Sequence, residues 1–145
     1  MKENKMLIFI ATGFFTNIIW ENWQFHLYGG TATSYPQLAI TFFGTLVDVC
    51  IFILIYWIMV ELFKDREWIN NMSWRKLFCL AILGLVAAIL NEKIALSLNA
   101  WSYLSAMPVV PILHIGLSPL LQLILLPIFS VFVTKLIFKK GSRVS

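Results

Sequence analysis

Four long apolar stretches constrain the fold of this 145-residue chain more than any other feature. They cover approximately residues 6–28, 36–63, 75–98 and 107–138. About 20 apolar residues in an α-helix span the hydrocarbon core of a bilayer, because a helix satisfies its own backbone hydrogen bonds where water is absent. We therefore expect an all-α, polytopic membrane protein, with four transmembrane helices in a single bundle that forms one domain over residues 1–145.

The composition supports this class and excludes several others. Apolar residues make up 60% of the chain and charged residues 12%, whereas a soluble domain is about half apolar and a quarter charged. An ordinary cytosolic enzyme, a disordered chain and a fibrous protein are therefore excluded. Cys50 and Cys79 lie on separate apolar stretches without a C-x-x-C pair, so we expect small hydrophobes buried in the membrane and no metal site.

The basic residues predict the orientation of the helices. The net charge of +4 does not indicate a nucleic-acid partner, because the basic residues lie at the ends of the apolar stretches. The connections 29–35 and 99–106 contain no Lys or Arg. By the positive-inside rule, both termini and the connection 64–73 are cytoplasmic in a bacterial-type inner (plasma) membrane. Ten of the eleven basic residues carry this pattern: Lys2, Lys5, Lys64, Arg66, Arg75, Lys76, Lys135, Lys139, Lys140 and Arg143.

Aromatic residues near the ends of the stretches are typical of interfacial belts. The inner belt would contain Trp57, Trp68 and Trp74, and the outer belt Tyr28, Tyr35, Trp101 and Tyr103.

Three carboxylic acids fall inside the apolar stretches, where ionisable groups are costly and often functional. A rise of 1.5 Å per residue places Glu21 and Glu92 about 22–26 Å from the inner boundary, in the outer third of the membrane. Asp48 lies near the midplane, about level with Asn17. His114, roughly 10 Å below the outer surface, would lie at the level of the two glutamates.

Helical spacing gives each stretch one polar or small-residue face. We expect these faces to pack inward, because lipid-facing carboxyl and amide groups are disfavoured. The faces are Asn17 and Glu21; Thr41, Gly44, Thr45 and Asp48; Gly84, Ala88, Asn91 and Glu92; and His114, Ser118 and Gln122. Two interpretations of the polar residues are open: interhelical hydrogen bonds that only hold the bundle together, or a functional site. The overlap of three carboxylates in depth favours a functional site.

The region 91–119 is the least generic part of the chain. Its Pro and Gly residues predict a broken or re-entrant start to the last helix, which is tolerated where the backbone lines a cavity. An aromatic mouth above this cavity would consist of Trp20, Trp23, Trp101 and Tyr103, with aromatic anchoring and simple proline kinks as the alternative.

An acid followed by W-x-Y, then M-P and G-L-S-P-L-L-Q, resembles small uncharacterised four-helix bacterial membrane proteins. The acid and W-x-Y arrangement is also similar to the small-subunit lycopene cyclases, which act on polyenes within the bilayer. The P-x-E-E/D motif of those cyclases does not occur here, so no catalytic role is taken from this resemblance.

The leading hypothesis is an outward-side pocket that binds a lipid-soluble molecule and isomerises or cyclises it by acid–base chemistry. Glu92 would be the acid, Glu21 or Asp48 the base, and His114 an orienting donor. Neither a cofactor nor a metal is expected. The substrate-binding candidates are Asn17, Trp20, Asn91, Trp101, Tyr103, Ser118 and Gln122.

Three alternatives remain open at this point. A proton-coupled small transporter would act as a homo-oligomer, because four short helices enclose little volume. A b-type haem could be ligated by His26 and His114, since haem sites form between facing helices. A non-catalytic membrane partner subunit is the third alternative.

Overall fold

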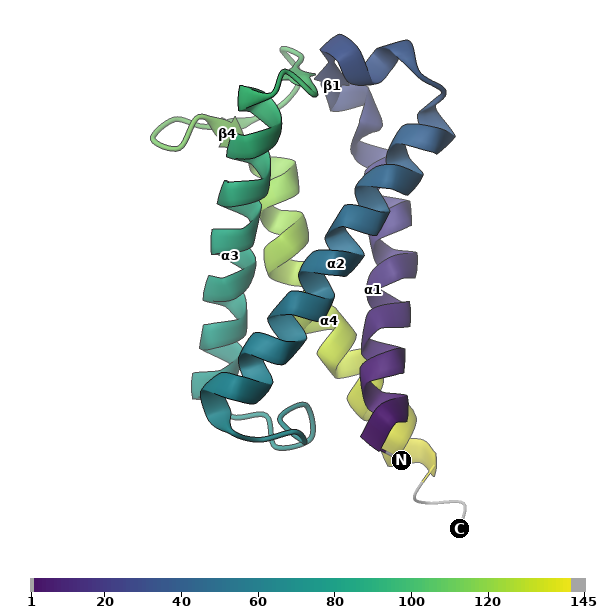
Figure 1. Cartoon of the computed structure of the whole chain (residues 1–145), viewed down its shortest axis with the longest axis vertical. Helices are drawn as coiled ribbons and strands as arrows, with labels where there is room; N and C mark the ends of the chain where they lie inside the picture. Colours follow the sequence, from purple (N-terminus) through teal and green to yellow (C-terminus); the bar gives the residue numbers. More distant parts are fainter. Residues whose placement is uncertain (1, 142–145) are drawn as a thin grey trace.

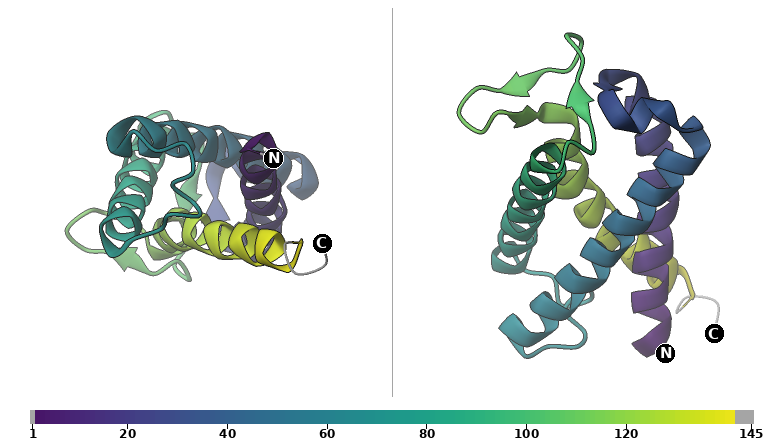
Figure 2. Two further views of the ribbon diagram at one scale, coloured as in Figure 1. Left: turned by 90° about the horizontal axis from the view of Figure 1, so that it is seen from below. Right: turned by 45° about the horizontal axis from the view of Figure 1, so that its top comes forward.

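A computed structural model describes residues 2–141 and shows four long helices that run along its long axis. They are α1 (Lys2–Gln24), α2 (Gln37–Phe63), α3 (Trp74–Ser97) and α4 (Leu117–Gly141). The start of α1, the end of α4 and the connection 64–73 lie together at what we call the basic end (Figure 1). Seen along the axis, the helices form a ring in the order α1, α2, α3, α4 (Figure 2).

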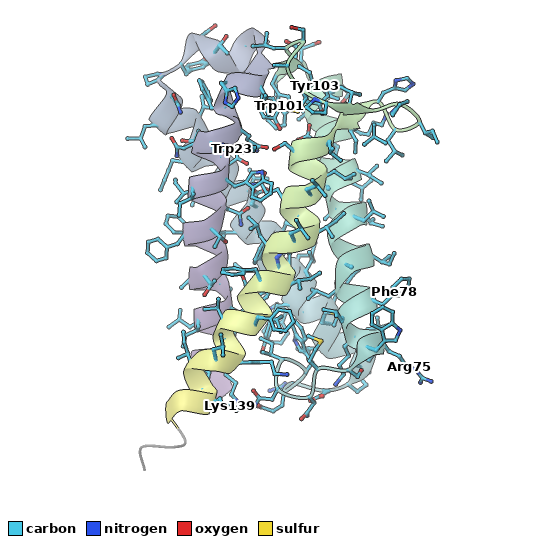
Figure 3. All side chains as sticks on the ribbon, turned by 180° about the vertical axis from the view of Figure 1, so that it is seen from behind. Trp23, Arg75, Phe78, Trp101, Tyr103 and Lys139 are labelled. Carbon is cyan, nitrogen blue, oxygen red and sulfur yellow. The ribbon has the colours of Figure 1, made fainter. Side chains whose placement is uncertain are left out.

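Short elements close the opposite end, which we call the strand end. The 3₁₀ helices Phe25–Leu27 and Gly30–Ser34 flank β1 (Tyr28–Gly29), which pairs antiparallel with β2 (Ser102–Tyr103). A second small hairpin pairs β3 (Val109–Val110) with β4 (Ile115–Gly116). Trp101 and Tyr103 lie at the strand end, whereas Arg75 and Lys139 lie at the basic end (Figure 3).

Local sequence signals explain the helix boundaries. Pro36 precedes α2, where its missing N–H is not needed. Lys64 ends α2 in the left-handed conformation, with φ of 48°. Ser73 caps α3 by accepting a hydrogen bond from the N–H of Lys76 at 3.4 Å.

The all-α expectation is confirmed, and within the described residues α2, α3 and α4 are each long and apolar enough to cross a membrane. Helix α1 has 23 residues and packs against α2 and α4, but polar residues interrupt its apolar sequence. Two helix boundaries differ from the expectation: the end of the first helix and the start of the last. The first helix ends at Gln24 rather than at residue 28, and the last begins at Leu117 rather than at residue 107.

The late start of α4 has a physical cause. Pro108 and Pro111 lack the N–H that a helix interior requires, and residues 109–116 form the β3–β4 hairpin instead. The hydrogen bond from the N–H of Leu117 to the carbonyl of Pro108, at 2.7 Å, closes this segment onto the start of α4. The expected break at the start of the last helix is therefore present, but residues 107–116 lie before the helix and not within it.

An aromatic cluster fills the bundle near the basic end. The Trp68 ring packs against Phe9 at a centroid distance of 6.0 Å and against Tyr56 at 5.8 Å. Trp68 comes from the connection 64–73 and is completely buried, so its assignment to an interfacial belt was wrong. Trp57 and Trp74 are exposed, as a belt requires. The connection thus closes the basic end with a buried side chain.

Ion pairs hold this connection in place. Lys76 donates to Oδ2 of Asp65 at 2.7 Å, and Lys5 pairs with Glu67. The hydrogen bond from Lys76 lowers the pKa of the Asp65 carboxyl below its ordinary value. Both pairs tie the connection to the starts of helices α1 and α3.

Candidate functional site

The polar face of α1 points into the strand-end half of the bundle. Asn17, Glu21 and Gln24 follow at spacings of four and three residues, which places them on one face of the helix. Asn17 and Gln24 are buried, and Glu21 is half-buried. The side-chain amide of Asn17 donates to the carbonyl of Gly13 at 2.8 Å, which fixes its orientation.

Gln122 of α4 is the centre of the hydrogen-bond network. Its Nε2 lies 2.9 Å from Oδ1 of Asn17, 2.8 Å from Oε1 of Glu21 and 2.7 Å from Oδ2 of Asp48. A side-chain amide has only two hydrogens, so three acceptor oxygens compete for them. Gln122 is 2% exposed and Asp48 is 4% exposed, so bulk water does not compete for these bonds. One amide therefore links α4 to both α1 and α2.

Two further contacts complete this part of the network. Nε2 of Gln24 donates to Oε1 of Glu21 at 2.9 Å and lies 2.8 Å from Oε1 of Gln122. The carboxyl groups of Glu21 and Asp48 share Nε2 of Gln122 as a donor. Two acids from different helices thus face each other across one buried amide.

Ser118, one turn before Gln122 on α4, extends the network toward the strand end. Its hydroxyl donates to Oε1 of Gln24 at 2.7 Å and accepts from Nε1 of Trp20 at 3.2 Å. The Trp20 ring in turn contacts Trp23 edge-on, with centroids 6.1 Å apart. Trp20 therefore contacts the polar network through its indole N–H, while Trp23 is exposed.

Glu92 of α3 forms the other part of the site. It is 2% exposed, and its Oε2 accepts hydrogen bonds from Nε1 of Trp101, at 3.3 Å, and from the hydroxyl of Tyr103. The pairing of Tyr28 with Tyr103 in the β1–β2 ladder fixes the position of this donor. A buried acid at the end of α3 thus anchors the loop that covers the bundle.

Tyr28 and Tyr103 lie outside the long helices and keep their protons firmly. Burial raises the pKa of the Tyr28 phenol far above its ordinary value, and the nearby Glu92 adds to the effect. Burial and the hydrogen bond to Glu92 likewise raise the pKa of Tyr103. Tyr103 therefore remains a hydrogen-bond donor to Glu92 throughout the physiological pH range.

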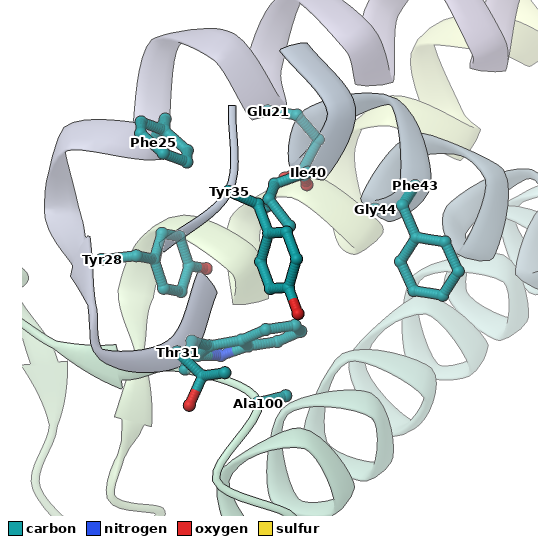
Figure 4. Close-up of a pocket in the computed structure, with 10 residues that line it drawn as sticks. Glu21, Phe25, Tyr28, Thr31, Tyr35, Ile40, Phe43, Gly44 and Ala100 are labelled. Atoms are coloured by element: carbon teal, nitrogen blue, oxygen red, sulfur yellow. The ribbon is translucent and has the colours of Figure 1, made fainter. Parts of the chain in front are cut away.

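A cavity of about 260 Å³ lies between α1, α2 and the strand-end loops. Apolar and aromatic side chains form most of its wall, and the Glu21 carboxyl lies on one side (Figure 4). Gly44 makes room for this carboxyl, because a Cβ at residue 44 would lie 3.1 Å from Oε2 of Glu21. The lining residues are Glu21, Phe25, Tyr28, Thr31, Tyr35, Ile40, Phe43, Gly44, Ala100 and Trp101.

A second, polar cavity of about 20 Å³ lies behind the first. Glu21, Asp48, Glu92, Asn91 and Gln122 all contribute to its wall. This volume is enough for one water molecule, which requires about 10–15 Å³ and several polar partners. Glu21 lines both cavities, so it connects the apolar cavity with the other two acids.

The structure brings together every predicted site residue except one. Those that meet in the network or around the two cavities are Glu21, Asp48, Glu92, Asn17, Trp20, Asn91, Trp101, Tyr103, Ser118 and Gln122.

His114 is the exception, and its placement on a helical stripe with Ser118 was wrong. It lies in the turn between β3 and β4, with φ of 55°, and its side chain is exposed. The N–H of His114 donates to the carbonyl of Val110 at 2.8 Å, a turn geometry that precedes the helix. His114 therefore has no contact with the acids.

The arrangement of the histidines does not favour haem. His26 is exposed at the strand end and contacts Trp23, while His114 lies in the exposed turn of the other hairpin. Among residues 2–141, no group of three His, Cys, Asp or Glu side chains is placed to hold a metal ion.

Gln24 and Tyr28 are site residues that sequence reasoning missed, whereas Gly44 was placed on the inward face of its helix without a role in the site. Gln24 is seven residues after Asn17 and continues its face, so helical spacing alone could have identified it. Tyr28 follows the end of α1, and only its pairing with Tyr103 brings it over the site. No sequence signal predicts that pairing. No protein-family model, curated protein or solved structure matches the chain.

Proposed function

We propose that the chain crosses the plasma membrane of a bacterial-type cell four times, with both termini in the cytoplasm. The side-by-side packing of α1 with α2 and α4 supports a fourth crossing, because α1 extends over the same length of the bundle (Figure 1). The basic residues Lys5, Lys76 and Lys139 gather at one end, as the positive-inside rule requires of the cytoplasmic side.

Single cysteines on the two connections test this orientation. In a Cys50→Ser, Cys79→Ser background, a membrane-impermeant maleimide should label Ser105→Cys in intact cells and Asn70→Cys only after lysis. Both positions are exposed, so accessibility reports the side of the membrane. Labelling of Asn70→Cys in intact cells would contradict the orientation.

We propose that the apolar cavity binds a lipid-soluble molecule with the Glu21 carboxyl against it. The observation that carries this proposal is a cavity of about 260 Å³ whose wall is almost entirely apolar yet contains the half-buried carboxyl group of Glu21. Apolar pockets with a few placed polar groups are typical of small-molecule sites. A water-filled polar channel would not have such a lining.

The site is also suited to acid–base rearrangement of an alkene. In its acid form, Glu21 would transfer its proton to one alkene carbon, and the faces of Tyr35, Phe43 and Trp101 would stabilise the cation at the next carbon. The Glu21 carboxylate would then remove a proton from a neighbouring carbon. The double bond moves, and no co-reactant is consumed.

Asp48 and Glu92 would support this chemistry from the small polar cavity, which they line together with Glu21. Two carboxyl groups in one buried site share a proton, because like charges at close range disfavour double ionisation. Glu21 and Asp48 are such a pair, since both accept from Nε2 of Gln122. We assign the acid role to Glu21 rather than to Glu92, since Glu92 lines only the small cavity.

The closed basic end favours a binding site over a transport path in this conformation. Phe9, Tyr56 and Trp68 fill the bundle between the site and the cytoplasmic side. A molecule in the cavity would therefore reach it from the membrane or from the strand end.

Native mass spectrometry with lipidomics tests the binding site. The wild type should retain a lipid-soluble molecule, and Gly44→Leu should reduce it about tenfold or more, because overpacking costs about 1–3 kcal/mol. Ala100→Leu fills the cavity from the opposite wall and should have the same effect, so the test does not depend on whether Gly44→Leu folds. Leu46→Phe adds bulk on the exposed face of α2 and serves as the control. Equal lipid content in all four proteins would contradict the proposal.

The same measurement in D₂O tests the acid–base role. The wild type should place deuterium in the bound lipid, and Glu21→Gln should lower the rate about 100-fold or more, the usual contribution of a general acid. Glu61→Gln makes the same change on an exposed glutamate at the basic end and should have no effect. Unchanged incorporation in Glu21→Gln would exclude Glu21 as the acid.

A further inference from the structure

A groove runs between α2 and α3 on the outside of the bundle. It has a volume of about 420 Å³, and its wall is apolar except for Asn91. Helix α2 crosses the bundle obliquely, so it meets α3 near the basic end and diverges from it toward the strand end (Figure 1). The groove follows this divergence.

The groove and the 260 Å³ cavity lie end to end along one face of α2. Ile40, Phe43 and Gly44 of α2 line the cavity, and groove residues follow Gly44 at spacings of three and four. This stripe contains Ile40, Gly44, Val47, Ile51, Leu54 and Ile58. From residue 40 to residue 58 the helix rises about 27 Å, at 1.5 Å per residue.

Even at a tilt of about 40°, this length covers about 21 Å of depth, which exceeds the depth of one membrane leaflet. The hydrocarbon core is about 30 Å thick, so one leaflet contributes about 15 Å. An acyl chain confined to its own leaflet would fill only part of the stripe. A longer chain, held at the strand end, would fill all of it.

The chemistry of the cavity restricts the head of such a molecule. Glu21 is the acidic group of the cavity, and the carboxylate that its proton transfer leaves would repel an anionic phosphate head. The volume of about 260 Å³ and the aromatic walls leave room for a small neutral head such as a hydroxyl group.

We propose that the molecule bound at Glu21 is a single-chain lipid with a small neutral head and a hydrocarbon tail longer than one leaflet, which lies along the α2–α3 groove. This inference rests on the proposed function and adds the class of molecule and its path. The tail enters sideways from the bilayer, because the groove opens to the hydrocarbon that surrounds α2 and α3. Asn91 lines both the groove and the small polar cavity, and so marks where the tail passes the acids.

Photocrosslinking in nanodiscs tests the path of the tail. The probes are decanol and eicosanol, each with a diazirine at the end of its chain, and the crosslinked residues are identified by mass spectrometry. Eicosanol should react mainly near Leu54, Ile58 and Leu83, and decanol mainly near Val47 and Asn91. Its shorter chain ends sooner along the same groove.

Two tryptophan variants make the test specific. Val86→Trp fills the part of the groove toward the basic end. It should reduce eicosanol crosslinking there about tenfold or more, because overpacking costs about 1–3 kcal/mol. Decanol crosslinking should remain. Phe129→Trp enlarges an exposed residue of α4 outside the groove and should change neither pattern.

The outcomes separate this inference from the proposed function. If decanol reacts near Val47 and Asn91 but eicosanol reacts evenly with membrane-facing residues such as Phe129, the long-tail path is wrong and the binding site stands. If decanol does not react near Val47 and Asn91 and eicosanol does not react along the groove, both proposals fail. If the two helices crosslink instead to a second copy of the chain, the groove is a subunit interface and the inference is overturned.

Discussion

Gly84→Ala is expected to destabilise the protein by about 2 kcal/mol or more, although alanine is the better helix former. A Cβ at residue 84 would collide with the backbone carbonyl of Leu123 in α4 and would lie 3.1 Å from Cα of Ile124. Backbone atoms cannot rotate away, so α3 and α4 must separate. Overpacking costs about 1–3 kcal/mol or more, and separation also loosens the packing around Gln122, which precedes Leu123 in α4.

Reversible unfolding in mixed micelles measures this effect. In an exposed helix, Gly→Ala stabilises by about 1 kcal/mol, so the sign of the change distinguishes a close helix contact from intrinsic propensity. Ile82→Phe adds more bulk to the same helix on its exposed side and should be nearly neutral. An increase in stability for Gly84→Ala would show that α3 and α4 do not approach as described.

Gln122→Leu is expected to destabilise the protein by about 3 kcal/mol or more. Leucine has a similar size but no donor, so Asn17, Glu21 and Asp48 each lose a buried partner. An unsatisfied buried polar group costs about 1–3 kcal/mol, and more where it is charged. The energy is expected to be large because one amide serves two helices.

Gln37→Leu provides the matched control. Gln37 is exposed, and its side-chain contacts with Asn22 are 3.4 Å long, so the same substitution should change stability by less than about 0.5 kcal/mol. Equal effects of the two substitutions, measured by the same unfolding method, would mean that Gln122 does not hold the network together.

The helices could be predicted from the sequence because a long apolar stretch in a membrane must form a helix to satisfy its backbone hydrogen bonds. The apolar stretches gave the ends of α2 and α3 to within a residue, since Pro36, Lys64 and Ser73 mark changes in composition as well as helix boundaries. The start of α4 was misplaced because residues 107–116 are apolar but not helical. Hydropathy indicates whether a segment is in an apolar environment, whereas Pro108 and Pro111 determine that the backbone here is not helical.

The helical part of the site was equally accessible to sequence reasoning. Depth along each helix placed Glu21, Asp48 and Glu92 at overlapping levels, and the structure places all three around one small cavity. Which carboxyl group lines the large cavity depends on side-chain direction and on the space above Gly44, neither of which spacing reveals.

The loop part of the site could not be predicted in the same way. Tyr28 and Tyr103 meet through a two-residue ladder between segments 75 residues apart in sequence. Trp68 enters the core from a polar connection, where composition alone indicates exposure. Pairings of this kind depend on the packed helices that bring the segments together.

The most direct test of an intramembrane binding site is an NMR measurement of what occupies the cavity. In nanodiscs containing isotope-labelled decanol, we predict intermolecular NOEs between the chain protons and the ring protons of Phe43 and Trp101, which Gly44→Leu removes. Water NOEs at these two rings, with decanol contacts only at membrane-facing residues such as Phe129, would contradict the existence of the site.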